Sequence, residues 1–508
     1  MANPILLAMV SGRLIRQVLA LITVPILVRY ITVAEYGLLT LGNTLLGIFT
    51  LLAVLGLPQG VTRYIAHHHS GGDSGKEKII GIISTSICFP LMISILLAIV
   101  SFFASDSIAL FFHNPGLSLV VKIFAISIPI VALIDILVSI FRGFKIPEVP
   151  AFAPVLRGSL WLLFLVMVIL IGLPFVGVLW ASIAAALATL LLIASYARRK
   201  KIPLSIKRYD NPIAKELLVF SLPLFGTGVV NNFLRWLGPL FLGYLAPMEA
   251  VGLYNAAFGL GIFTFIFRDA LALMYLPVIS ELHATVSQEN LKRIYATMSR
   301  WLLILTLPIF FLLFLFSNAA VSILYGSPYL QSCGAVQIIA VALLAQVASG
   351  PCGMNLIAMG KTRFLMWSAL VGLGVNITLS VILIPRMSFM GAAIAFSAAS
   401  IIVQGMNWVK LFSTSSIHPV SKSYLKIWGI ATTLTFLGWI VMHNLGLSLV
   451  WSGIAFITLL MTYSLLILVT KSLEIEDVSV VSSIERKMFP KGGPIEKILT
   501  RFLPRDKG

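Results

Sequence analysis

Long apolar stretches alternate with short polar connections over almost the whole chain. Two of the apolar stretches are weaker: the first contains Arg13 and Arg16, and the eighth ends near Arg268 and Asp269. Each stretch has about 20 residues, the length that crosses a bilayer as a helix. The pattern therefore predicts an all-α integral membrane protein with about fourteen transmembrane helices, near 7–29, 36–57, 79–103, 119–141, 151–172, 174–197, 217–245, 249–275, 299–317, 335–357, 363–385, 389–411, 424–443 and 447–470.

The composition agrees with a membrane protein. Of the 508 residues, 59% are hydrophobic and only 11% are charged, whereas a soluble domain is about 45–50% apolar and about 25% charged. The net charge of +18 is spread over short connections between apolar spans, which is the pattern of the positive-inside rule. We therefore expect membrane lipids around the chain and no nucleic-acid partner. The three cysteines, Cys88, Cys333 and Cys352, are too widely spaced for a disulfide framework or a zinc site.

The distribution of Lys and Arg predicts the orientation. With a cytoplasmic N-terminus, 28 of the 36 Lys and Arg residues fall in cytoplasmic segments, and the external connections hold only Arg29 and Arg386. We therefore expect a multi-pass protein of the cell (plasma or inner) membrane with both termini in the cytoplasm. The external connections are short, the longest near 318–334. A glycan polymerase or ligase acting outside would need a larger catalytic loop, so we expect no enzyme.

An internal repeat appears when the chain is shifted by 214 residues. Glu35 then falls on Glu249, and Leu46–Thr50 falls on the identical Leu260–Thr264. Six predicted helices separate the copies, so both start on the same side of the membrane as parallel repeats. The predicted domains are an N-terminal six-helix lobe (1–200), a C-terminal six-helix lobe (201–415), two additional helices (416–470) and a cytoplasmic tail (471–508).

Several arginines lie inside the predicted spans. Arg13 and Arg16 share one face of the first helix, and the first acidic residue of the chain is Glu35. A cation at the bilayer centre costs about 2.5–3.5 kcal/mol even on an insertion scale, so such residues usually face a cavity or a partner. Arg235 lies near mid-depth on the first helix of the second repeat. A cationic interior predicts a protein that handles an anion.

Eight short motifs carry a resemblance to a known family. The chain resembles Wzx-type polysaccharide or O-antigen flippases of the polysaccharide transport family, in the MOP superfamily. The resemblance implies a MATE-like fold of two six-helix lobes around a central cavity. It also implies alternating-access transport of a polyprenyl-(pyro)phosphate-linked oligosaccharide from the cytoplasmic to the outer leaflet, for assembly of cell-surface glycan. The motifs are Arg16–Leu19, Glu35–Gly37, Leu55–Arg63, Gly252–Tyr254, Tyr325–Gly326, Gly360–Lys361, Leu383–Arg386 and Gly391–Ala395.

Such a cargo has a phosphate head that arginine suits, because the planar guanidinium donates two parallel hydrogen bonds and stays charged. The candidate phosphate-binding residues are Arg13, Arg16, Arg235 and Arg268. For Arg13 the alternative is that its side chain extends to the cytoplasmic headgroups. The expected partners are the lipid-linked oligosaccharide and glycosyltransferases or a polymerase of the same pathway.

Asp135 and Arg157 lie in the cytoplasmic third of successive predicted helices. We favour a structural pair; the alternative is that Asp135 titrates and couples transport to a proton or sodium ion. Four buried amides lie in predicted spans, where we favour hydrogen bonds between helices over a glycan path. They are Asn231, Asn232, Asn255 and Asn376.

Two other transporters share this architecture. One is a peptidoglycan-precursor (lipid II) flippase, which differs in the glycan. The other is a multidrug exporter, although a cation exporter needs an acidic residue deep in the first repeat and the first span has none. His67, His68 and His69 lack spaced partner ligands, so we expect no metal site. No phosphate-cradling loop occurs, so we expect no nucleotide and no other cofactor, apart from a coupling ion.

Overall fold

The computed structural model describes residues 4–69, 72–204, 211–268, 275, 279, 288–416, 418–445, 448–470 and 472, and within them the regular structure is entirely helical. The first ten helices are α1 (Pro4–Tyr30), α2 (Val33–Val54), α3 (Leu57–His68), α4 (Gly72–Phe103), α5 (Ser105–Phe111), α6 (Gly116–Ala125), α7 (Ser127–Gly143), α8 (Glu148–Ile171), α9 (Phe175–Arg199) and α10 (Asn211–Leu245). The others are α11 (Met248–Ile262), the 3-10 helix η1 (Phe263–Phe265), α13 (Gln288–Leu315), α14 (Ser317–Leu324), the 3-10 helix η2 (Ser327–Ser332), α15 (Cys333–Ala348), α16 (Cys352–Ala358), α17 (Thr362–Met387), α18 (Phe389–Ser415), α19 (Lys422–Leu445) and α20 (Leu449–Val469).

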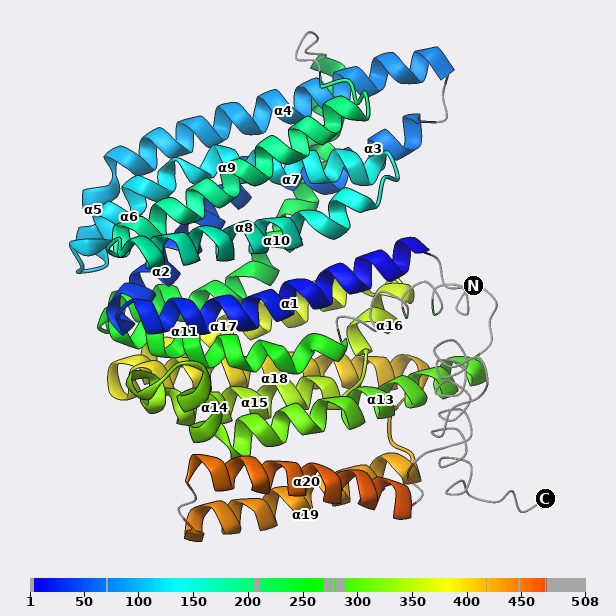
Figure 1. Cartoon of the computed structure of the whole chain (residues 1–508). Helices are drawn as coiled ribbons and strands as arrows, with labels where there is room; N and C mark the ends of the chain where they lie inside the picture. The colour runs from blue at the N-terminus through cyan, green and yellow to red at the C-terminus, as the bar shows by residue number, and fades with distance from the viewer. Residues whose placement is uncertain are drawn as a thin grey trace, which may run out of the picture. The chain divides into compact units, whose positions relative to one another are not determined.

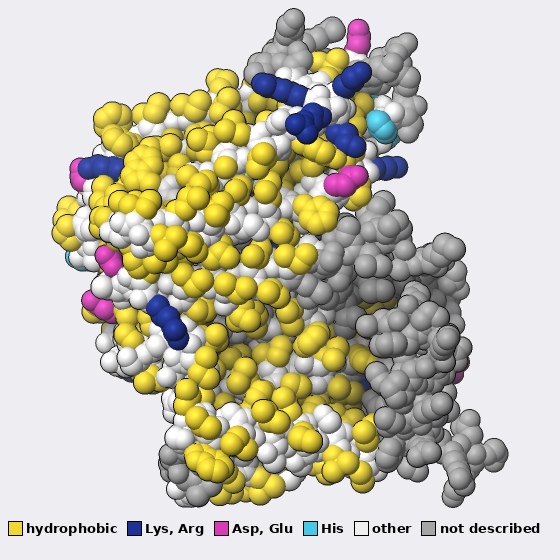
Figure 2. Space-filling model, viewed as in Figure 1, with side chains coloured by type: hydrophobic (Ala, Val, Ile, Leu, Met, Phe, Trp, Pro, Cys, Tyr) yellow, Lys and Arg dark blue, Asp and Glu magenta, His cyan; other side chains and the backbone are white. Residues whose placement is uncertain are grey.

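Many of these helices can cross a membrane. Among the residues described, eleven are long and apolar enough, and twelve if α6 and α7, which meet at a bend of 43°, form one span. Hydrophobic side chains cover most of the face shown in Figure 2, while Lys and Arg gather near the ends of α4 and α9. The predicted spans 7–29 and 217–245 lie within α1 and α10, which have 27 and 35 residues. The chain is an all-helical integral membrane protein, and the count of fourteen spans stays a prediction.

The predicted cytoplasmic tail, 471–508, lies outside the described residues apart from Ser472. Packing divides the chain into two compact units: unit 1 contains 1–256 and 373–396, and unit 2 contains 257–372 and 397–508. The predicted domain boundaries stay a prediction.

The start of unit 1 shows how local sequence sets helix ends. Thr32 and Glu35 form a capping box at the start of α2, in which each side chain accepts a hydrogen bond from the other residue's backbone N–H. The helix ends at Leu55 and Gly56, both in the left-handed backbone region at φ 45° and 73°. This turn leads straight into α3, which occupies part of the predicted connection 58–78. A Cβ at Gly56 would lie 2.5 Å from the carbonyl oxygen of Ser221, so only glycine fits there.

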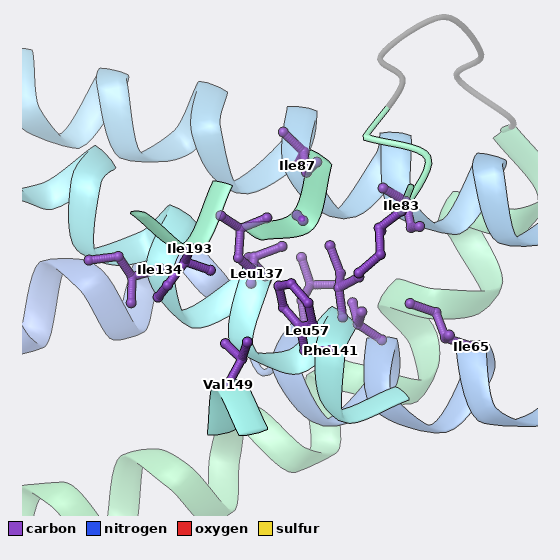
Figure 3. Close-up of a cluster of buried hydrophobic side chains, with 14 of the residues drawn as sticks. Leu57, Ile65, Ile83, Ile87, Ile134, Leu137, Phe141, Val149 and Ile193 are labelled. Carbon is purple, nitrogen blue, oxygen red and sulfur yellow. The ribbon is translucent and has the colours of Figure 1, made fainter. Parts of the chain in front are cut away.

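The hydrophobic core of unit 1 joins α3, α4, α7, α8 and α9. Figure 1 shows α4, α7 and α9 as neighbouring helices, and α7 packs extensively against both α4 and α9. Figure 3 shows how side chains from these helices meet below α4. The core buries apolar side chains of neighbouring helices against one another and holds α7 in place between them. Its labelled members are Leu57, Ile65, Ile83, Ile87, Ile134, Leu137, Phe141, Val149 and Ile193.

The helix boundaries repeat along the chain. α8 and α17 begin 214 residues apart, at Glu148 and Thr362. α9 and α18 also begin 214 residues apart, at Phe175 and Phe389. This is the offset that aligns the two halves of the sequence. The recurrence of helix starts at this spacing therefore supports the internal repeat.

Unit 2 contains helix interruptions whose freed carbonyl groups receive side-chain donors. Pro308 lies inside α13 and has no N–H for the carbonyl of Ile304, four residues earlier. The hydroxyl of Tyr463 on α20 donates to this carbonyl at 3.0 Å. A polar group buried without a partner is costly, especially in a membrane. The bond therefore satisfies a group that the proline leaves without its helical partner.

A second interruption separates α15 from α16. Gly350 has φ 73°, and the Cys352 N–H bonds to the Gly350 carbonyl instead of continuing the helix. The carbonyl of Ala348 accepts a hydrogen bond from the Tyr424 hydroxyl of α19, and that of Ser349 accepts one from Tyr295 of α13. The two C-terminal helices, α19 and α20, which lie side by side in Figure 1, are thus each bonded to a main-chain carbonyl in the rest of unit 2.

Candidate functional site

Arg16 lies on the side of α1 that packs against α8. A Cβ at Gly12 would lie 2.4 Å from the carbonyl oxygen of Ala151, and a Cβ at Gly158 would lie 3.5 Å from Leu19. Arg16 follows Gly12 by four residues and precedes Leu19 by three, so the three share one helix face. The Arg16 side chain is nevertheless exposed. The helix that packs against α8 therefore leaves this cation open to its surroundings.

The opposite side of α1 carries the apolar surface. Ile15, Val18 and Ile22 are 43%, 50% and 45% exposed, as expected for residues that face lipid. Helical spacing places Arg16 away from them. In the part of the chain that the structure describes, Arg16 makes no ion pair within 4 Å. The side chain of Arg13 lies outside the described residues.

Arg157 lies at nearly the same height as Arg16. The contacts of Gly12 with Ala151 and of Leu19 with Gly158 each join residues 139 apart, so α1 and α8 run parallel in a constant register. Arg16 is therefore level with residue 155, and Arg157 is within one helical turn of that level. Its side chain is half-buried. The structure thus places two of the arginines that the sequence predicted separately at a similar height on neighbouring helices.

Asp135 borders this region from α7. Its neighbours Ile134 and Ile136 are buried, and α7 packs against α2, α3, α4, α8 and α9, yet the Asp135 side chain is exposed. Arg157 is the opposite charge that acts on it most strongly, followed by Arg142. No ion pair within 4 Å joins Asp135 and Arg157 among the residues described. The two charges attract one another without contact, and the choice between a structural pair and a coupling residue stays a prediction.

Arg235 lies on the inner side of α10. Trp236 packs against Gly47 of α2, where a Cβ would lie 2.9 Å from the indole ring, and Gly238 packs against Tyr254 of α11. By helical spacing, Arg235 lies between these two directions. Its side chain is exposed and makes no ion pair within the described ranges. Arg235 is therefore placed toward the second helices of both repeats.

Arg268 belongs to unit 2, unlike the other candidate arginines. It follows η1, and its guanidinium carbon lies 3.6 Å from the centroid of the Phe265 ring. This is a cation–π contact, which holds the guanidinium over its own helix. Asp269 lies outside the described residues. The phosphate-binding role of Arg268 stays a prediction.

One of the candidate amides joins two helices, and two others bond within their own helix. Asn255 on α11 donates to the Tyr36 hydroxyl on α2 at 2.8 Å, so it joins helices of the two repeats. Asn232 donates to the Gly228 carbonyl of its own helix at 2.9 Å, and Asn376 accepts from Ser380 at 3.1 Å. The side chain of Asn231 lies outside the described residues. A glycan path along these residues stays a prediction.

Arg300 is a buried cation near the start of the predicted span 299–317. α13 begins at Gln288, so Arg300 lies more than three turns inside the helix, where it is 1% exposed and has interaction partners. The polar residues Gln288–Asn290 are the sequence feature that could have predicted this earlier start of the helix. Among the described residues, no cluster of three His, Cys, Asp or Glu side chains is arranged to hold a metal ion.

Comparisons with known proteins agree with this architecture. A sequence profile for the family described as "Polysaccharide biosynthesis protein" matches residues 5–283. A curated relative, the probable low-salt glycan biosynthesis flippase Agl15 of Haloferax volcanii, is 24% identical over 195 residues, 38% of this chain and 41% of that protein. Stage V sporulation protein B of Bacillus subtilis is 23% identical over 450 residues, 83% of this chain and 84% of that protein.

Solved structures show the same fold. The lipid II flippase MurJ in an inward closed conformation has a TM-score of 0.72 at 17% identity and covers 90% of this chain and 97% of its own. An inward-facing multidrug resistance MATE family transporter of the MOP superfamily has a TM-score of 0.66 at 15% identity, over 80% of this chain and 98% of its own. The MOP-type fold predicted from the sequence is therefore confirmed.

Proposed function

Because the chain belongs to the polysaccharide biosynthesis protein family, a family of membrane transporters and not enzymes, we propose that it flips a polyprenyl-(pyro)phosphate-linked oligosaccharide from the cytoplasmic to the outer leaflet by alternating access. The observation that carries the proposal is the exposure of Arg16 and Arg235, without ion pairs in the described part of the chain, on the packed sides of α1 and α10. These are the first helices of the two repeats.

The chemistry of this cargo fits the arginines. A phosphate offers several anionic oxygens, and a guanidinium binds two of them with parallel N–H···O bonds. Removal of both partners from water strengthens the attraction. With fourteen spans and both termini cytoplasmic, as proposed, the membrane potential also favours outward movement of an anion, by about 2.3 kcal/mol per charge per 100 mV.

A second candidate cargo is the peptidoglycan precursor lipid II. It is supported by the fold shared with MurJ over 90% of this chain. Both cargoes have a prenyl tail and a phosphate head, so the arginines alone do not separate them. The two cargoes differ in their glycan.

The test uses the purified chain reconstituted in proteoliposomes. A fluorescent polyprenyl-pyrophosphate oligosaccharide is placed in the bilayer, and its arrival in the opposite leaflet is measured by chemical quenching. We expect flipping above the rate of protein-free vesicles, and slower flipping of lipid II than of the oligosaccharide carrier. Equal rates with and without the protein would contradict the proposal, and faster flipping of lipid II would favour the second cargo.

A further inference from the structure

The helices α7 and α9 end in the same kind of turn. In each, the N–H of a lysine bonds to the carbonyl three residues earlier, and the N–H of the isoleucine that follows bonds to the carbonyl five residues earlier, which is a Schellman turn. The lysines, Lys145 and Lys201, have φ 58° and 53°. Glycine is the usual residue at this left-handed position, and Gly172 occupies it at the end of α8. The turns after α7 and α9 therefore hold a long cation where glycine would be easier to accommodate.

The two turns lie close together and are anchored in one core. The rings of Phe141 on α7 and Tyr196 on α9 are 5.8 Å apart between centroids. Ile146 and Ile202, which follow the two lysines, both pack into the hydrophobic core of unit 1. Figure 2 shows Lys and Arg side chains gathered near the end of α9. The fold thus fixes the backbone that carries these cations and brings the two helix ends together.

Five exposed cations belong to these two helix ends, and we call them the basic cluster. None of the five makes an ion pair within 4 Å in the described ranges. The Lys200 ammonium lies 5.5 Å from the centroid of the Tyr196 ring. Glu148 is the acidic residue of the segments 142–148 and 196–202, so the cluster keeps a strong positive charge and attracts anions. Its members are Lys145, Arg198, Arg199, Lys200 and Lys201.

The apolar surface of α9 ends where the basic cluster begins. Leu191 and Leu192 are 60% and 50% exposed on a helix that is long and apolar enough to cross a membrane, so they face lipid tails. Arg198 and Arg199 follow them by seven residues, which places each arginine on the same side of α9 as one leucine, about 10 Å farther along. Tyrosine is enriched at this boundary between tails and headgroups, where Tyr196 lies. The basic cluster is therefore at the level of the lipid phosphates.

We propose that the basic cluster binds the headgroups of anionic phospholipids in the leaflet at this end of unit 1. A cluster of Lys and Arg next to a membrane helix attracts anionic lipid over neutral lipid. The position of the cations directly beyond lipid-facing leucines favours a lipid over a soluble acidic partner, which would not need that level. The pattern of Lys and Arg predicts that this leaflet is cytoplasmic. The inference depends on the chain crossing a membrane and is independent of the cargo.

The experiment measures which lipids gather beside the basic cluster of the full chain. A fluorophore is attached to Ser195→Cys, an exposed position one turn before Arg199. Cys88→Ser removes the half-buried thiol, while Cys333 and Cys352 are buried. The chain is reconstituted in phosphatidylcholine nanodiscs with a trace of phosphatidylglycerol or phosphatidylcholine that carries a nitroxide quencher on the same acyl carbon. We expect phosphatidylglycerol to quench about tenfold more efficiently at low salt, since each cation near the surface favours an anionic lipid about fivefold. At high salt, which screens the charges, the two lipids should quench equally.

The variants remove charge without straining the backbone. Lys145→Gly and Lys201→Gly place glycine at left-handed positions, so the double variant should fold, and it should lower the preference for phosphatidylglycerol about fivefold. Lys201→Arg keeps the charge and should keep the preference. His113→Gly is the matched control, because His113 has φ 52° in the same kind of turn after α5. Glycine relaxes the backbone there and leaves the basic cluster intact.

Three results would overturn the inference. Equal quenching by the two lipids in the wild type at low salt would exclude an anionic-lipid surface and leave a soluble acidic partner as the occupant. A wild-type preference in the double glycine variant would show that the lysines do not bind lipid, and a lower melting temperature of that variant would then assign them to stabilising the helix ends. An equal loss of preference in His113→Gly would show that turn geometry and not charge sets the lipid preference. No readout depends on flipping, so a failure of the proposed function leaves these results unchanged.

Discussion

Two polar regions lie among the apolar helices, one in each unit, and they differ in how their groups are satisfied. In unit 2, Tyr295, Tyr424 and Gln404 each donate to a carbonyl near the break between α15 and α16. In unit 1, Arg16 and Arg235 are exposed and make no ion pair within the described part of the chain. Polar groups that only stabilise a fold are normally paired. Unit 2 therefore uses these polar groups for structure, and we propose that unit 1 keeps its two arginines available for a ligand.

The largest expected effect is the loss of either unpaired arginine. Arg16→Ala and Arg235→Ala should each lower the initial flipping rate in proteoliposomes about 100-fold, the scale of losing one charge-assisted bidentate contact to the cargo phosphate. Val18→Ala is the control, because Val18 lies on the apolar side of α1. The protein should insert and fold normally in all three variants. Wild-type flipping rates in both arginine variants would show that these arginines do not serve transport, and the proposed difference between the two units would be wrong.

A smaller effect is expected when lysine keeps the positive charge but lacks the two parallel N–H donors of the guanidinium. Arg16→Lys and Arg235→Lys should retain part of the activity, with a rate reduced about tenfold, since an ammonium binds phosphate as a point charge. The same flipping assay measures this. If lysine is as damaging as alanine, the guanidinium acts through packing or shape, and charge is not the property that matters.

The tyrosine bonds of unit 2 should affect stability and leave the flipping rate of the folded protein unchanged. Tyr463→Phe leaves the Ile304 carbonyl without the hydroxyl donor, at a cost of roughly 1–3 kcal/mol, which a thermal melt in detergent detects. Pro308→Ala restores an N–H to α13. Tyr463→Phe should therefore cost less stability when it is introduced into the Pro308→Ala protein than when it is introduced into the wild type. Equal losses in both backgrounds would show that the hydroxyl does not compensate for the proline.

The smallest effect is expected in unit 1 at the contact between α5 and α6. Hydrogen bonds from Ser118 and Lys122 hold the pKa of Asp106 below its usual value. The stabilisation is therefore present above the ordinary pKa of aspartate and is lost as the pH falls through the lowered one. Asp106→Asn should melt slightly below the wild type at neutral pH and together with it in strong acid. A difference that persists in acid would point to packing instead of charge.

Sequence patterns predicted the helical membrane fold and the repeat offset, because each depends on composition or on local signals. They did not predict α3 or the break at Gly350, since these depend on close packing with Ser221 and with tyrosines from distant helices. Arg16 and Arg157 were found separately as intramembrane charges. Their common height follows from the register of α1 on α8, which no single segment contains.

The bond from Tyr463 to the Ile304 carbonyl has a consequence for how the chain can be shortened. Deletion of α19 and α20 would remove the donors to Ile304 and Ala348 together, and lipid tails offer no replacement. A viable derivative without these two helices would therefore need alanine in place of Pro308 and a straightened segment between α15 and α16. The last two helices cannot simply be removed, because carbonyl groups of the neighbouring helices would lose their hydrogen-bond donors.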